Sequence, residues 1–205
     1  RSGIDLSRFG VRYSHAGVSL QASENTPWSV RQLYYACDEG KPRIYDQGMS
    51  GFVLADDASA VGYVSVVLLP SPEAAELERA ALSYQNCKQW VIELLATAWG
   101  AAGTTAGDNT EAQRAQAQGW LKGRGYQPSR LVVDSRPLVW LGVFIPWVHN
   151  DDHPPEAVAE MAYRVSMPDS IEAFVQATVP GATRIEFCHT DRHVVVRRGW
   201  ELIPE

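Results

Sequence analysis

The fold is decided by the stretch Tyr13-Ser14-His15-Ala16-Gly17-Val18, which places a histidine inside a short apolar alternation. Such alternation is typical of a β-strand, and it extends over residues 11–20. A second strand, rich in aromatic residues, is predicted at 28–36, after a turn signal at residues 24–27. The two strands should pair as an antiparallel hairpin that carries His15 in its first strand.

The second informative segment is Tyr84-Gln85-Asn86-Cys87, which precedes an apolar stretch that ends near Gly100. Asn86 is a good helix N-cap, so Cys87 is predicted to be the first residue of an amphipathic helix. Its expected apolar face, which should dock on the sheet, comprises Trp90, Val91, Leu94, Leu95 and Ala98.

The pair His15 and Cys87 suggests thiol chemistry. A cysteine at a helix N-terminus lies near unpaired backbone N–H groups and the positive end of the helix dipole, which lower the pKa of its thiol. A neighbouring imidazole would take the thiol proton, and the same N–H groups could hold an oxyanion. The alternative is that Cys87 is a small buried hydrophobic residue and that His15 is a packed strand residue.

A third group would have to orient the imidazole and fix its tautomer. The partner strand of the hairpin supplies three polar options, Gln32, Tyr34 and Asp38. Gln32 lies in the middle of that strand and could accept a ring N–H through its amide oxygen, so it is our predicted orienting residue.

The rest of the chain alternates between strand and helix signals. The strand pattern breaks at residues 38–42, and an irregular loop is predicted at residues 48–51. Strands are predicted at 61–69 (hydrophobic enough to be central), 130–134 and 138–145, helices at 71–82, 111–122, 156–162 and 168–178, and a terminal hairpin at 184–189 and 193–198. Strands first, helices in the middle and strands last predict an α+β fold with a largely antiparallel sheet.

Composition limits the function classes. With 205 residues, 45% of them hydrophobic, the chain can form one domain with a buried core. Its net charge of −6 disfavours binding to nucleic acid, and no apolar stretch is long enough for a membrane-spanning helix. The first residue is Arg1 rather than Met, which favours a protein from which a leader was removed.

The remaining histidines and cysteines allow a competing zinc hypothesis, carried by His149, His153, Cys188, His189 and His193. Two prolines follow His153, and Cys188 and His189 should point to opposite faces of one strand, so we predict no metal site and no cofactor. A disulfide between Cys37 and Cys188 would spare Cys87 in an exported protein.

These motifs resemble a known superfamily. Ser14-His15-Ala16-Gly17-Val18 is similar to the histidine strand of circularly permuted papain-like enzymes, the NlpC-like and lecithin–retinol acyltransferase-like group, and Asn86-Cys87 matches the cysteine at its helix start. The order His15, Gln32, Cys87 is the permuted order. More closely, residues 28–35, 86–95 and 167–174, with Arg198-Gly199-Trp200, resemble an uncharacterised bacterial family of predicted exported proteins.

The resemblance implies a permuted papain-like core at 1–105 and a C-terminal elaboration at 106–205. It also implies a periplasmic or secreted cysteine hydrolase or acyltransferase that attacks an amide, peptide or thioester bond in a small-molecule, peptide or cell-envelope substrate. Gln32 departs from the acid, histidine or asparagine that is common at the third position. A catalytically inactive binding module of the same fold is the alternative.

Overall fold

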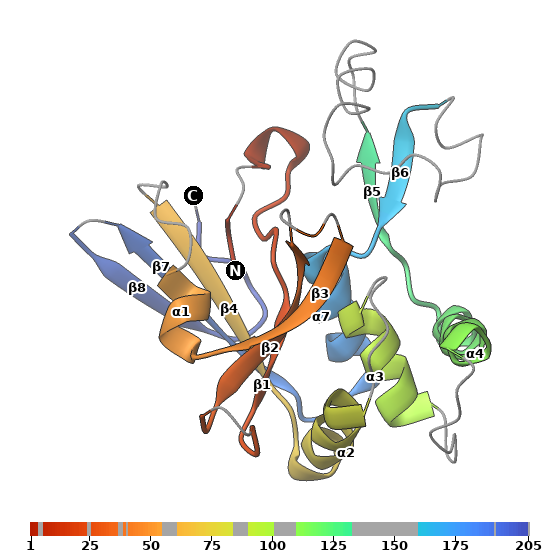
Figure 1. Ribbon diagram of the computed structural model, residues 1–205. Coiled ribbons are helices and arrows are strands. Elements are labelled where there is room, and N and C mark those ends of the chain that lie inside the picture. The colour runs from red at the N-terminus through yellow and green to blue at the C-terminus, as the bar shows by residue number, and fades with distance from the viewer. Residues whose placement is uncertain are drawn as a thin grey trace.

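The computed structural model describes residues 1–3, 6–23, 26–36, 39, 41–54, 61–83, 90–100, 110–132, 160–190 and 192–204. Within these ranges the protein is a mixed α+β structure with two three-stranded sheets and one two-stranded sheet, all of them antiparallel. In Figure 1 the sheet formed by residues 17–47 lies near the centre, the sheet that joins residues 61–68 to the C-terminal hairpin lies to its left, and the longer helices lie to its right. The predicted fold class, α+β with antiparallel strands, is therefore confirmed.

The first sheet contains the predicted hairpin. Strand β1 (Gly17–Leu20) pairs with β2 (Ser29–Ala36), and Gly17 lies opposite Gln32. The strand is shorter than the predicted 11–20, because the backbone at residues 14 and 15 donates to Arg1.

The third strand of this sheet, β3 (Lys41–Gln47), and the short helix α1 (Met49–Leu54) were not predicted. The irregular loop predicted at residues 48–51 is wrong, because α1 begins at Met49, and β3 begins within the predicted break at 38–42. Proline has no backbone N–H to donate to a neighbouring strand, so Pro42 argued against a strand here. Strand β3 lies at the edge of its sheet, where this missing donor is tolerated.

The second sheet has the order β4–β7–β8 and joins distant parts of the chain. Strand β4 (Val61–Leu68) pairs with β7 (Thr183–Thr190), which in turn pairs with β8 (Val194–Arg198). The terminal hairpin is confirmed. The expectation that β4 is central is wrong, because β7 holds that position.

A two-stranded sheet pairs β5 (Ser129–Val132) with β6 (Ala162–Val165). The helix predicted at 156–162 is wrong at its end, where β6 begins. Residues 138–145, predicted as a strand, lie outside the described residues.

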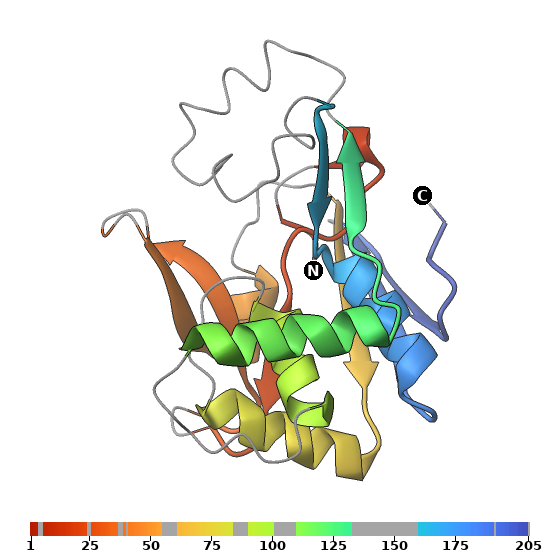
Figure 2. The ribbon, with the colours of Figure 1, turned by 90° about the vertical axis from the view of Figure 1, so that its right-hand side faces the viewer.

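The core forms around α3 (Trp90–Gly100), which packs against α2 (Ser71–Ser83), α4 (Thr110–Gly123) and the first sheet (Figures 1 and 2). Helix α7 (Pro168–Thr178) adds Ile171, Phe174 and Val175. The predicted apolar face of α3 does contribute to the core, but burial extends further round the helix, since Ile92, Glu93 and Ala96 are as buried as Trp90 and Leu94. A helix that is apolar nearly all round is a central helix, and only Glu93 and Thr97 interrupt this one.

Arg31 of β2 fixes the first sheet to the helices. Its guanidinium donates to the carbonyl of Ala81 at 2.6 Å, near the C-terminal end of α2, and pairs with Asp46 of β3 at 2.8 Å. A cation at a helix C-terminus interacts favourably with the helix dipole. Among the described helices, none is both long enough and apolar enough to span a bilayer.

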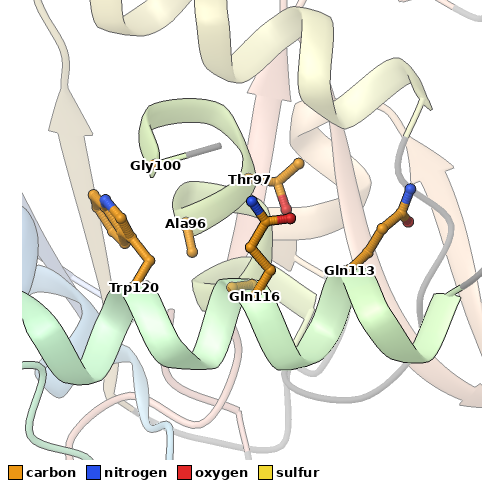
Figure 3. A pocket seen from close by; sticks show the side chains of 7 residues that line it. Ala96, Thr97, Gly100, Gln113, Gln116 and Trp120 are labelled. Carbon is orange, nitrogen blue, oxygen red and sulfur yellow. The ribbon is translucent and has the colours of Figure 1, made fainter. Parts of the chain in front are cut away.

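The crossing of α3 and α4 is close because Gly100 has no side chain. A Cβ added at Gly100 would lie 2.5 Å from Cγ and Cδ2 of Trp120, whose ring is seen beside Gly100 in Figure 3. We expect Gly100→Ala to destabilise the protein by about 1–3 kcal/mol, because the indole would have to move. Urea denaturation followed by circular dichroism measures this change.

The matched control is Gly119→Ala in α4, where an added Cβ would meet nothing within 4 Å. At that exposed helical position, alanine should stabilise the protein by about 0.5–1 kcal/mol. Equal effects of the two substitutions would contradict the packing described here.

Candidate active site

The backbone of His15 is held by the first residues of the chain. The nitrogen of His15 donates to the carbonyl of Arg1 at 3.1 Å, and the nitrogen of Arg1 donates to the carbonyl of His15 at 2.8 Å. On its other side the same segment bonds to β4, because Ser2 N donates to the carbonyl of Tyr63 at 2.8 Å. Both views show the N-terminus between β4 and the chain that leads into β1 (Figures 1 and 2).

The imidazole of His15 lies against Gly3. A Cβ added at Gly3 would be 2.4 Å from Cδ2 and 2.7 Å from Nε2 of the ring, and 3.0 Å from Oγ of Ser14. Nε2 of His15 is buried. The side chain that we predicted as the catalytic base is therefore packed in place.

Gln32 is placed on the partner strand as predicted. It is 4% exposed and lies opposite Gly17, two residues beyond His15. A Cβ at Gly17 would lie 2.6 Å from Cγ1 of Val30 and 3.4 Å from Cβ of Gln32. The glycine thus permits close approach of the neighbouring strand.

The two faces of this hairpin have different neighbours. Val18 and Leu20 belong to the same core as α3, and Leu33 packs against that core. Because side chains alternate along a strand, Gly17 and Gln32 lie on the opposite face. Gln32 is therefore directed away from the helical core.

Cys87 lies outside the described residues. Helix α3 is described from Trp90, three residues later, to Gly100. The structure places Gln32 in β2 and His15 two residues before β1, outside the strand in which it was predicted, and the placement of the thiol stays a prediction.

The residues of the zinc hypothesis do not form a cluster in the described part of the chain. His149 and His153 lie outside it, and the described ranges contain no group of three potential ligands. Cys188 is a free, buried thiol and so does not form the bridge with Cys37 that the sequence left open. His189 lies over Gly62, where an added Cβ would be 2.1 Å from Nε2.

A buried charged cluster that sequence reasoning missed anchors the segment before His15. Tyr13 donates to Glu186, and Arg184 donates to the Tyr13 hydroxyl at 2.7 Å. These three side chains are at most 1% exposed. Arg12 reaches the same carboxylate at 3.0 Å, and Arg184 pairs with Glu172 of α7 at 2.8 Å. The sequence signal was two opposite charges at alternate positions of one strand, Arg184 and Glu186.

The cluster shifts the pKa values of Tyr13 and Glu186 in opposite directions. Burial raises the pKa of Tyr13, and its hydrogen bond to Glu186 raises it further. Burial alone would raise the pKa of Glu186, but bonds from Tyr13, the Ile203 N–H and Arg12, with the charge of Arg184, lower it on balance. Glu186 is therefore a structural carboxylate in its ionised form.

A notch between α3 and α4 is lined by Ala96, Thr97, Gly100, Gln113, Gln116, Ala117 and Trp120 (Figure 3). Its volume of about 10 Å³ is no more than one water molecule needs. This notch is too small for a substrate.

The described fold and site define a class: an α+β protein with a buried central helix and a histidine fixed at the end of an antiparallel hairpin. The model of a bacterial family, described as an uncharacterized protein conserved in bacteria (DUF2145), matches residues 1–83 and 79–175. The chain belongs to this family. No curated protein and no solved structure matches it.

Proposed function

We propose that this protein is a cysteine-dependent hydrolase or acyltransferase of permuted papain-like fold that acts on an amide, peptide or thioester bond. Cys87 is the nucleophile, His15 the general base and then the general acid, and Gln32 the orienting residue. The observation that carries the proposal is the closely packed imidazole of His15, two residues before a hairpin whose second strand holds the buried Gln32. Its cell-envelope location, periplasmic or secreted, is part of the same proposal.

The chemistry follows from these groups. His15 takes the proton of the Cys87 thiol, and the thiolate attacks the carbonyl carbon of the substrate. The tetrahedral intermediate collapses to an S-acyl enzyme as the imidazolium gives its proton to the leaving amine or thiol. Water, or a second acyl acceptor, then gives a proton to His15 and attacks the carbonyl carbon of the S-acyl enzyme. The C–S bond breaks, the acyl group leaves on its acceptor, and His15 returns the proton to the sulfur of Cys87.

The central position of α3 supports this arrangement. A nucleophile needs a rigid support, and α3 is the most buried helix of the described chain, with Ile92, Leu94 and Ala96 fully buried. Gln32 faces away from the helical core to which α3 belongs. The proposal therefore requires the thiol of Cys87, three residues before the described start of α3, to reach the imidazole of His15 near the hairpin.

The test is the rate of iodoacetamide alkylation at Cys87 between pH 5 and 9, followed by peptide mass spectrometry. We expect an apparent pKa well below the ordinary thiol value of about 8.5. His15→Ala should move the profile toward that value and slow alkylation at pH 6 on the order of 10- to 100-fold, since each pKa unit is a tenfold change in thiolate.

His193→Ala is the matched control, because this exposed histidine lies next to β8. It should leave the profile unchanged, and buried Cys188 should react slowly in every variant. An ordinary thiol profile for Cys87 that is indifferent to His15→Ala would exclude the catalytic pair.

A further inference from the structure

The segment Arg1–Gly3 lies between two parts of the molecule that the sequence places far apart. Arg1 exchanges backbone hydrogen bonds with His15, and Ser2 bonds to Tyr63 of β4 through both its backbone and its hydroxyl. The hydroxyl of Ser2 accepts from the Tyr63 N–H at 2.8 Å. This segment therefore connects the chain around His15, which leads into β1, to the second sheet.

Only glycine fits at the third position of this segment. An added Cβ would come within 2.4 Å of the His15 ring, whereas ordinary contacts of a Cβ begin at about 3.4 Å. The neighbouring Ser14 hydroxyl, at 3.0 Å, restricts the same space. The backbone of Gly3 thus forms one side of the imidazole's environment.

We propose that Gly3 is a positioning residue for His15 and that the docking of residues 1–3 on β4 fixes the imidazole for proton transfer. The proposal rests on the function proposed above, because a positioned base presupposes that His15 is the base. Gly3 itself makes no contact with substrate in this scheme. It acts through the ring, whose orientation it determines by close packing.

Displacement of the His15 ring is expected to slow proton transfer. A misplacement of a catalytic group by about 1 Å can cost on the order of 100-fold in rate, so a methyl group that pushes the ring aside should have a measurable effect. The segment is short and contributes no side chain to the main hydrophobic core. A change at Gly3 should therefore affect the ring more than the global fold.

The experiment compares Gly3→Ala with Gly48→Ala, a glycine where an added Cβ would meet nothing within 4 Å. Three quantities are measured on the full chain: the ¹H–¹³C signals of the His15 ring, the pH profile of Cys87 alkylation, and thermal unfolding. We expect Gly3→Ala to shift the ring signals and slow alkylation at pH 6 on the order of 10- to 100-fold. Gly48→Ala should change neither.

A second variant, Ser2→Ala, keeps the proposal testable if Gly3→Ala does not fold. It removes the hydroxyl bond to Tyr63 without touching the imidazole, and it should shift the ring signals in the same sense but less strongly. If His15→Ala slows alkylation but neither variant changes the ring signals or the rate, the positioning role is overturned and the catalytic pair stands. If alkylation is already indifferent to His15→Ala, both proposals fall.

Discussion

Replacing Glu186 by alanine is expected to lower the free energy of unfolding by about 3–5 kcal/mol, the usual cost of breaking a buried ion pair. The carboxylate is fully buried and accepts from Tyr13, from Arg12 at 3.0 Å and from the Ile203 N–H at 2.6 Å. Its loss leaves the Arg184 guanidinium, itself 1% exposed, with less of the negative charge that compensates its burial. Urea denaturation followed by circular dichroism gives the change.

The control is Glu201→Ala, which removes the partner of Arg197 in a largely exposed pair near the same end of the sheet. Exposed ion pairs contribute about 0–1 kcal/mol, so this variant should stay close to wild type. A loss below about 1 kcal/mol for Glu186→Ala would show that the cluster contributes little to stability.

The pH dependence follows from the direction of the shift. The pKa of Glu186 is lower in the folded protein than its ordinary value of 4.5. Its contribution is therefore present above pH 4.5 and is lost as the pH falls from there through the folded-state pKa. In the Glu186→Gln variant, which cannot ionise, this part of the acid destabilisation should be absent.

Trp90→Ala should cost about 3–5 kcal/mol, because it removes a large side chain that is 1% exposed at the start of the central helix. The cavity would lie between α3 and the elements that cover it, where the surrounding side chains can collapse only in part. Trp90→Phe should recover much of the loss, since it keeps most of the buried apolar area. Chemical denaturation of the three proteins measures the order.

Trp28→Ala is the corresponding control, because Trp28 is 56% exposed. It should change the unfolding free energy by no more than about 0.5 kcal/mol. Similar losses at Trp28 and Trp90 would contradict the burial pattern on which the description of the core depends.

Segments with strong local signals were predicted well from the sequence. The helices predicted at 71–82, 111–122 and 168–178 agree with α2, α4 and α7. The elements that failed have weak or conflicting signals. Pro42 concealed the edge strand β3, and Gly48 and Gly51 concealed the short helix α1.

Long-range organisation was beyond sequence reasoning. The pairing of β4 with β7 depends on contacts between the two halves of the chain, and no local pattern encodes which distant strand is the partner. The same limitation concealed the charged cluster, because Tyr13, Glu172 and Glu186 meet only in the folded molecule.

For the candidate site, the sequence predicted the hairpin and the position of Gln32 on its second strand, and both are confirmed. The prediction that His15 lies within the first strand is wrong, because β1 begins two residues later, at Gly17. It did not predict that Arg1 and Gly3 would hold His15, because a close approach of backbone to a ring leaves no periodic signal. Cys87 remains where the sequence argument placed it, as a prediction.

The partnership of residues 61–68 with residues 183–190 also bears on synthesis. Loop closure over such a separation is slow, and a strand without its neighbour exposes unpaired hydrogen-bonding groups. While the ribosome is still making the C-terminal hairpin, the nascent chain must carry β4 unpaired on the β7 side. Assistance by a chaperone would matter most during that interval.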